Sequence, residues 1–143
     1  MKRFEFGLAK IRDYRRQQLE MEEAKLQPLL LERQALEAES SRIASEAADT
    51  RRLLMVTGSA ESQELAASDL YLRHLAAEKK RHAAKVADWQ VRTSKQQQAV
   101  VEARRRVRLL EKLEERKFRE WKIGLDREQE NLSAELYLAR WKK

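Results

Sequence analysis

The chain has 143 residues, of which 3 are Gly, 1 is Pro, none is Cys and 38% are charged. So few helix breakers among so many charged residues are typical of long helices or a coiled coil, and the lack of cysteine excludes a disulfide scaffold and a thiolate zinc site. The net charge is +7, but 24 acidic residues are interleaved with the 31 basic ones, which favours solvated helix faces over a nucleic-acid-binding surface.

No segment approaches the roughly 20 consecutive apolar residues that a membrane-spanning helix requires. Charged residues interrupt the N-terminal stretch MKRFEFGLAKIRDYRR, so it does not resemble the apolar core of a secretion signal. We therefore expect a cytoplasmic protein without direct membrane insertion, which associates with a membrane only by docking.

Residues 4–56 are predicted to form the first of two long helices. Apolar side chains recur mostly at steps of three, four or seven residues, which is the pattern of a coiled-coil seam. The seam consists of Leu8, Ile11, Leu19, Leu26, Leu29, Leu36, Ile43, Ala47 and Leu54, with Arg33, Ser40 and Thr50 at core-like positions. Pro28 removes the hydrogen bond to the carbonyl of Ala24, so we expect a bend near residues 24–28.

A turn is predicted at residues 57–60, where Gly58 can close one helix and Ser59 can cap the next. A second helix then spans residues 61–141, with Gly124 as a point of weaker helix propensity. Because the turn is short, the two helices should form an antiparallel coiled-coil hairpin, an all-α fold in one domain over residues 1–143.

Antiparallel pairing about Gly58 brings together residues whose numbers sum to roughly 117, by simple register arithmetic. Phe4 is then expected near Leu113, Ile11 near Arg106, and Leu36 near Arg81. The second helix continues beyond about Leu113 as a C-terminal overhang without an intramolecular partner. The overhang carries Phe118, Trp121, Leu125, Leu132, Leu136 and Trp141. A lone helix with an apolar stripe indicates a binding surface.

The same register merges arginines of both helices into one group, which we name the basic band. Its members are Arg12, Arg15, Arg16, Arg104, Arg105, Arg106 and Arg108. Two interpretations are open: either Asp13, Glu102 and Glu111 neutralise the band as ordinary surface pairs, or its excess charge is a docking surface.

Sequence features of an enzyme are missing. There is no Gly-rich phosphate loop, and His74 and His82 lie eight residues apart, too far to share one metal ion on a helix. Glutamates are spread over helix surfaces that offer no enclosed pocket. We expect no catalytic activity, no cofactor and no metal.

The chain resembles the FliJ family of bacterial flagellar export proteins over essentially its whole length. At the N-terminus the resemblance rests on the pattern Phe4-x-Phe6-x-Leu8-x-x-Ile11-Arg12. In the C-terminal half it rests on residues 107–116 (VRLLEKLEER) and on residues 127–130 (REQE).

The resemblance implies a non-enzymatic stalk protein of the flagellar type III secretion apparatus, an antiparallel two-helix coiled coil like a rotary ATPase shaft. The terminal end would dock in the pore of the hexameric export ATPase, FliI, and promote its assembly and activity. The hairpin end would contact the membrane export gate protein, FlhA, which would place the protein peripherally at the inner membrane. Some family members also escort export chaperones or substrates.

Site residues follow from this resemblance. The family's gate-contacting pattern of aromatic, Leu, Ala and His matches Tyr71, Leu75, Glu78 and His82, with Glu78 departing from Ala. Leu75 and His82 are also seam positions, so plain packing is the alternative role. For the ATPase ring, the expected residues are the basic band together with Phe118, Trp121 and Leu125.

Two other functions stay open at the level of sequence. One is the equivalent stalk of a virulence secretion system, the YscO class. The N-terminal Phe-x-Phe-x-Leu pattern favours the flagellar stalk over this one. The other is a basic coiled-coil protein that binds nucleic acid through phosphate contacts. The acids interleaved along both helices argue against that second function, so no nucleic-acid partner is expected.

Overall fold

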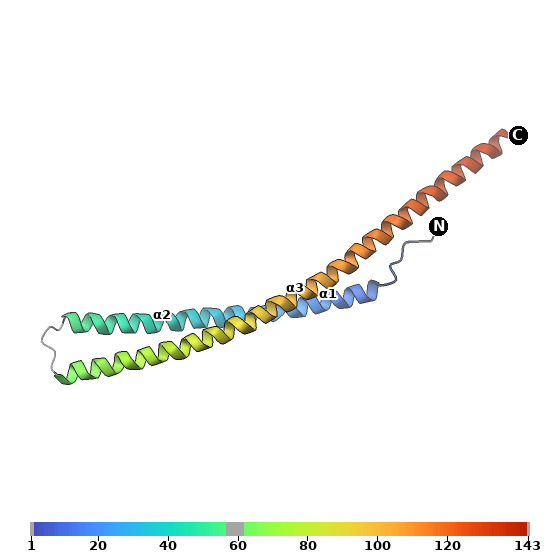
Figure 1. The fold of residues 1–143 in the computed structure, drawn as a ribbon. Helices are drawn as coiled ribbons and strands as arrows, with labels where there is room; N and C mark the ends of the chain where they lie inside the picture. Colours follow the sequence, from blue (N-terminus) through green and yellow to red (C-terminus); the bar gives the residue numbers. More distant parts are fainter. Residues whose placement is uncertain (1, 57–61, 143) are drawn as a thin grey trace. The chain divides into compact units, whose positions relative to one another are not determined.

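The computed structural model describes residues 2–56 and 62–142, and these form three helices (Figure 1). Helix α1 spans Ala9–Ala24, α2 spans Leu26–Val56 and α3 spans Ser62–Trp141. No strand occurs in the part of the chain that the structure describes, which confirms the all-helical prediction. The long helix α3 packs against both α1 and α2. The predicted turn at residues 57–60 lies outside the described residues.

The chain divides into two compact units, and α3 contributes to both. One unit comprises Glu23–Gln98, and the other comprises Met1–Glu22 with Ala99–Lys143. We name them the 23–98 unit and the terminal unit.

In the 23–98 unit, α2 and α3 are joined by hydrogen bonds from α3 side chains to the α2 backbone. The indole nitrogen of Trp89 donates to the carbonyl of Leu29, and Nε2 of His82 donates to the carbonyl of Leu36, both at 2.8 Å. Each pair is seven residues from the next on its helix, one heptad repeat. The contact of Leu36 with His82 agrees with the predicted position near Arg81.

The first predicted helix is interrupted near Pro28. Helix α1 ends at Ala24, Lys25 is in a turn, and α2 begins at Leu26, which places Pro28 in the first turn of α2. Proline is tolerated in the first turn of a helix, where backbone N–H groups have no helical acceptor. In the interior of a helix it destabilises the structure, because it has no N–H group to donate to the carbonyl four residues earlier. The structure thus has two helices, α1 and α2, where a single helix over residues 4–56 is predicted, and the interruption at Lys25 lies within the range of the predicted bend.

In the terminal unit, the first helix does not begin at Phe4, and that part of the prediction is wrong. Residues 2–6 are not helical, residues 7–8 form a turn, and α1 begins at Ala9. The turn is closed by a hydrogen bond from the Ala9 amide to the Phe6 carbonyl at 3.1 Å. Glycine at position 7 disfavours a helix there, and the indole of Trp121 holds the segment by donating to the Lys2 carbonyl at 3.0 Å.

The non-helical segment carries Phe4 further along α3 than the register predicts. Its ring lies 5.2 Å from that of Phe118 and 5.9 Å from that of Trp121, both further along α3 than Leu113, although Phe4 and Leu113 line the same shallow hollow. An extended residue advances by about 3.3 Å where a helical residue advances by about 1.5 Å, so the segment reaches several residues beyond the predicted partner.

The core of each unit is a thin seam. Among the described residues, those that are buried are Ile43, Leu75 and His82 in the 23–98 unit and Val100 and Val107 in the terminal unit. So few buried residues, two pairs of them at heptad spacing, are typical of a helix-to-helix interface and not of a broad globular core.

Candidate functional site

Acidic neighbours neutralise part of the basic band. Arg12 forms ion pairs with Glu114 and with Asp13, the latter at 3.2 Å. Arg16 pairs with Glu111 at 3.1 Å, and Arg106 pairs with Glu102 at 3.6 Å. The first of the two interpretations therefore holds for these three arginines.

The remaining members of the band differ in their surroundings. Arg15 donates to the side chain of Gln18 at 2.9 Å and lies over the ring of Tyr14, and Arg104 also has a partner. Arg105 and Arg108 are exposed and form no ion pair with any residue in 2–56 or 62–142. They are the part of the band that is available for docking.

Lys112 extends this surface and was not singled out from the sequence. It is exposed and, like Arg105 and Arg108, has no ion pair within the described residues. Steps of three and four residues place the three cations on one face of α3, roughly opposite the buried Val100 and Val107. The sequence spacing alone could have identified Lys112, because residues three and four positions apart on a helix lie on the same face. We name Arg105, Arg108 and Lys112 the outer basic face.

Charge around this face is unbalanced. Residues 12–16 and 102–114 contain eight basic side chains, namely seven arginines and Lys112. They contain four acidic ones, Asp13, Glu102, Glu111 and Glu114, which leaves an excess of four positive charges. Such an excess attracts an acidic surface and weakens as salt screens it.

The predicted ring-binding aromatics have intramolecular partners, which corrects the expectation that the helix is alone beyond Leu113. Phe118 and Trp121 stack on each other with ring centroids 5.7 Å apart, and both contact Phe4. Phe118 is still 43% exposed, whereas Trp121 and Leu125 are only partly exposed. An aromatic cluster of the terminal unit thus occupies part of the predicted docking surface.

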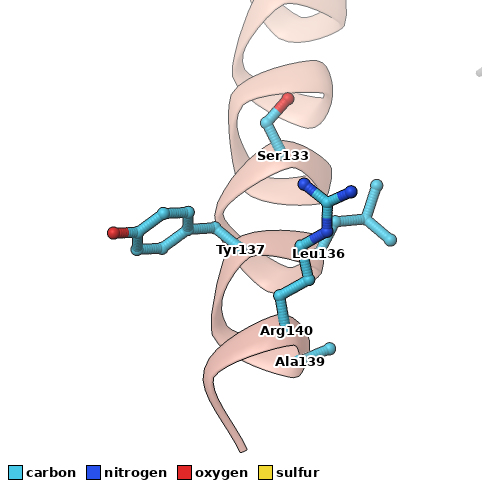
Figure 2. Close-up of a pocket in the computed structure, with 5 residues that line it drawn as sticks. All are labelled: Ser133, Leu136, Tyr137, Ala139 and Arg140. Atoms are coloured by element: carbon cyan, nitrogen blue, oxygen red, sulfur yellow. The ribbon is translucent and has the colours of Figure 1, made fainter. Parts of the chain in front are cut away.

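The unpartnered stretch begins after Leu125. All described residues from Asp126 to Lys142 are exposed, although α3 remains helical to Trp141 and is continuous through Gly124. The exposed apolar side chains are Leu132, Leu136, Tyr137, Leu138 and Trp141. A shallow hollow is lined by Ser133, Leu136, Tyr137, Ala139 and Arg140, and Figure 2 shows that Tyr137 projects to one side of the helix and Leu136 to the other.

The four predicted gate-binding residues are divided between the seam and the surface. Leu75 is 2% exposed and His82 is 8% exposed, so both are packed within the 23–98 unit. Tyr71 and Glu78 remain partly accessible. A partner could reach the latter two without opening the seam, and gate binding by this group stays a prediction.

The accessible pair belongs to a polar network between α2 and α3. The hydroxyl of Tyr71 donates to Glu46 at 2.8 Å, and Arg42 pairs with Glu46 at 3.1 Å and with Glu78 at 3.2 Å. The pKa of Glu46 lies below its ordinary value, first because Tyr71 donates to the carboxylate and second because Arg42 does. The pKa of Tyr71 is raised, chiefly because the hydrogen bond to Glu46 stabilises the protonated hydroxyl.

Within residues 2–56 and 62–142, no group of three or more His, Asp or Glu side chains is arranged to hold a metal ion. No described helix is both long and apolar enough to cross a membrane. No protein-family model, no curated protein and no solved structure matches the chain.

Proposed function

We propose that this protein is the non-enzymatic stalk of the flagellar type III export apparatus, an antiparallel coiled-coil hairpin that docks into the ring of the export ATPase. In this proposal the terminal unit binds FliI and promotes ring assembly and hydrolysis. The opposite end contacts the export gate protein FlhA, so the protein is cytoplasmic and joins the inner membrane through the apparatus. Export chaperones or substrates are further partners.

The observation that carries the proposal is the composition of the terminal unit. One helix there presents both an outer basic face and, after Leu125, a stretch with exposed apolar side chains. Cations next to unpartnered apolar residues are what a helix needs to dock into a pore lined by acidic and apolar groups. The resemblance to the FliJ family implies that this pore is that of the export ATPase ring.

Co-purification tests this proposal directly. The full chain, carrying an affinity tag, should retain FliI at low salt and less of it at high salt, because screening weakens the basic face. Arg105→Gln combined with Arg108→Gln should reduce retention. As a matched control, Arg51→Gln with Arg52→Gln removes two exposed charges of the 23–98 unit and should have little effect. Failure of the unmodified chain to retain the ATPase at low salt contradicts the proposal.

The same experiment distinguishes the flagellar function from that of a virulence-type stalk. If the chain retains an injectisome ATPase in preference to the flagellar one, the YscO-type function replaces the flagellar function. The shape and the docking surfaces are common to both, so the identity of the retained ATPase decides between them.

A further inference from the structure

The last turns of α3, residues 125–142, form a segment whose apolar face has no partner among the described residues. Leu132 is 56% exposed and Leu136 is 63% exposed, four residues further on. Two shallow hollows share Ser133 and lie along one strip of this helix. They are lined by Leu125, Glu128, Gln129, Leu132 and Ser133, and by Ser133, Leu136, Tyr137, Ala139 and Arg140 (Figure 2).

Charge is distributed unequally along the segment. Its first part is acidic on balance, with Asp126, Glu128 and Glu130 against Arg127, whereas its end is basic, at Arg140 and Lys142. A partner of uniform charge would be attracted to one end and repelled by the other. A second copy of the segment that runs in the opposite direction places its basic end beside the acidic part of the first copy, and its acidic part beside the basic end.

We propose that residues 125–142 of α3 pair with the same segment of a second copy of the chain, in antiparallel orientation about a two-fold axis. The inference does not depend on the proposed function. It commits to a second copy because the charge pattern is complementary to its own reverse, which is what an isologous two-fold interface requires.

The apolar spacing selects one register. Leu125, Gln129, Leu132, Leu136 and Ala139 follow one another at steps of four and three residues, the pattern of a coiled-coil seam. Aligning two such segments in opposite directions, with residue numbers that sum to about 268, places Leu132 against Leu136 of the second copy. The two-fold axis repeats this contact, so four leucines form the centre of the interface.

The residues that flank the seam then pair by charge. Asp126 faces Arg140 of the second copy, and Glu128 faces Lys142 of the second copy, each pair occurring twice by symmetry. Neither Asp126 nor Arg140 has an ion pair with a described residue of its own chain, so these two carry the argument. Glu128 has an interaction within the chain that pairing would exchange.

The same register has one unfavourable contact, which gives it a specific signature. Glu135 flanks the seam near the axis and faces Glu135 of the second copy. Like charges at such positions weaken a helix pair. Removing the charge with Glu135→Gln should therefore strengthen the association.

Sedimentation velocity of the full chain over a range of concentrations tests the pairing. The acid-reversed variant, Asp126→Lys with Glu128→Lys, and the base-reversed variant, Arg140→Glu with Lys142→Glu, should each raise the dissociation constant about tenfold or more. An equimolar mixture of the two variants should associate as the unmodified chain does, because each altered end then meets an opposite charge. Arg52→Glu, a reversal on α2, is the matched control and should leave the constant unchanged.

Several results would overturn the pairing. They are a monomer at every concentration up to about 100 μM, reversed variants that associate like the unmodified chain, and a mixture that does not recover. Far-ultraviolet circular dichroism of each variant confirms that α3 is intact. Recovery in the mixture cannot come from misfolded chains, since it needs both segments to be helical.

Discussion

Thr93 illustrates at the scale of one residue how the seam tolerates a polar side chain. Its hydroxyl is buried and has no hydrogen-bond partner among the described residues, whereas the hydroxyl of Thr50 donates to the Glu46 carbonyl at 2.8 Å. A buried polar atom without a partner destabilises the folded state. The sequence cannot tell which of the two hydroxyls is satisfied, because that depends on side-chain rotamers.

Thr93→Val should be neutral or should raise the free energy of unfolding by up to about 1 kcal/mol, since it removes the unsatisfied hydroxyl and keeps the branched shape. Thr50→Val is the matched control and should lower the same free energy by about 1 kcal/mol, because a hydrogen bond is lost. Urea unfolding followed by circular dichroism measures both. A loss for Thr93→Val as large as that for Thr50→Val would show that Thr93 has a partner.

The pair of Tyr71 and Glu46 makes stability depend on pH. Because the pKa of Glu46 is lowered from an ordinary value of 4.5, its interactions stabilise the fold above that pH. The stabilisation is lost as the pH falls through the lowered pKa. Tyr71→Phe removes the largest cause of the shift, so the pKa of Glu46 should rise towards 4.5 and its share of the acid sensitivity should shrink.

Carbon-detected nuclear magnetic resonance of the glutamate carboxyl groups measures that change. Tyr14→Phe serves as the control, since Tyr14 accepts a hydrogen bond from Gln18 at 2.8 Å and donates to no carboxylate in the described chain. An unchanged pKa of Glu46 in Tyr71→Phe would contradict the assigned cause.

At the scale of elements, what periodicity and proline chemistry can predict agrees with the structure. The interruption at Lys25 lies where Pro28 predicts a bend, and α3 follows from a long sequence with few helix breakers. The start of α1 could not be predicted in this way. Phe4 and Phe6 continue the apolar pattern of a helix, but their segment is held by contacts with Phe118 and Trp121, more than 100 residues away in sequence.

Pro28→Ala should join α1 and α2 by restoring an amide donor for the Ala24 carbonyl. We expect a gain in helicity and a rise of about 1–2 kcal/mol in the free energy of unfolding, less than the roughly 3 kcal/mol that an interior proline costs, because the existing break already relieves part of that cost. Gln27→Ala, at a neighbouring exposed position, is the control. A decrease in stability for Pro28→Ala would indicate that the fold requires the break.

At the scale of the whole molecule, the sequence predicts the candidate site only in part. It identifies the arginines and three of the acids that pair with them, Asp13, Glu102 and Glu111, but not Glu114, the second partner of Arg12. A register sum of roughly 117 places Arg12 near Arg105, nine residues before the glutamate that it contacts. Likewise Leu75 and His82 fit both a seam and a binding pattern, and only packing shows that they are buried.

The two docking proposals for the terminal unit can be related by a simple expectation. If residues 125–142 enter the ATPase ring, they cannot pair with a second copy at the same time. Binding to the ring and self-pairing would then compete. The acid-reversed chain is expected to be monomeric, so it would bind the ring without first dissociating from a second copy.

Stimulation of the export ATPase is the measurement that tests the central proposal most directly. Titrating the full chain into FliI should raise its rate of ATP hydrolysis and its fraction of rings to a plateau. Replacing Arg104, Arg105, Arg106 and Arg108 by Gln should shift that plateau to higher protein concentration, and the loss of Arg105 and Arg108 should account for most of the shift, because Arg106 is already paired with Glu102. Circular dichroism checks that these variants keep their helices. A hydrolysis rate and a ring fraction that stay unchanged at saturating concentrations of the unmodified chain would contradict the proposed function.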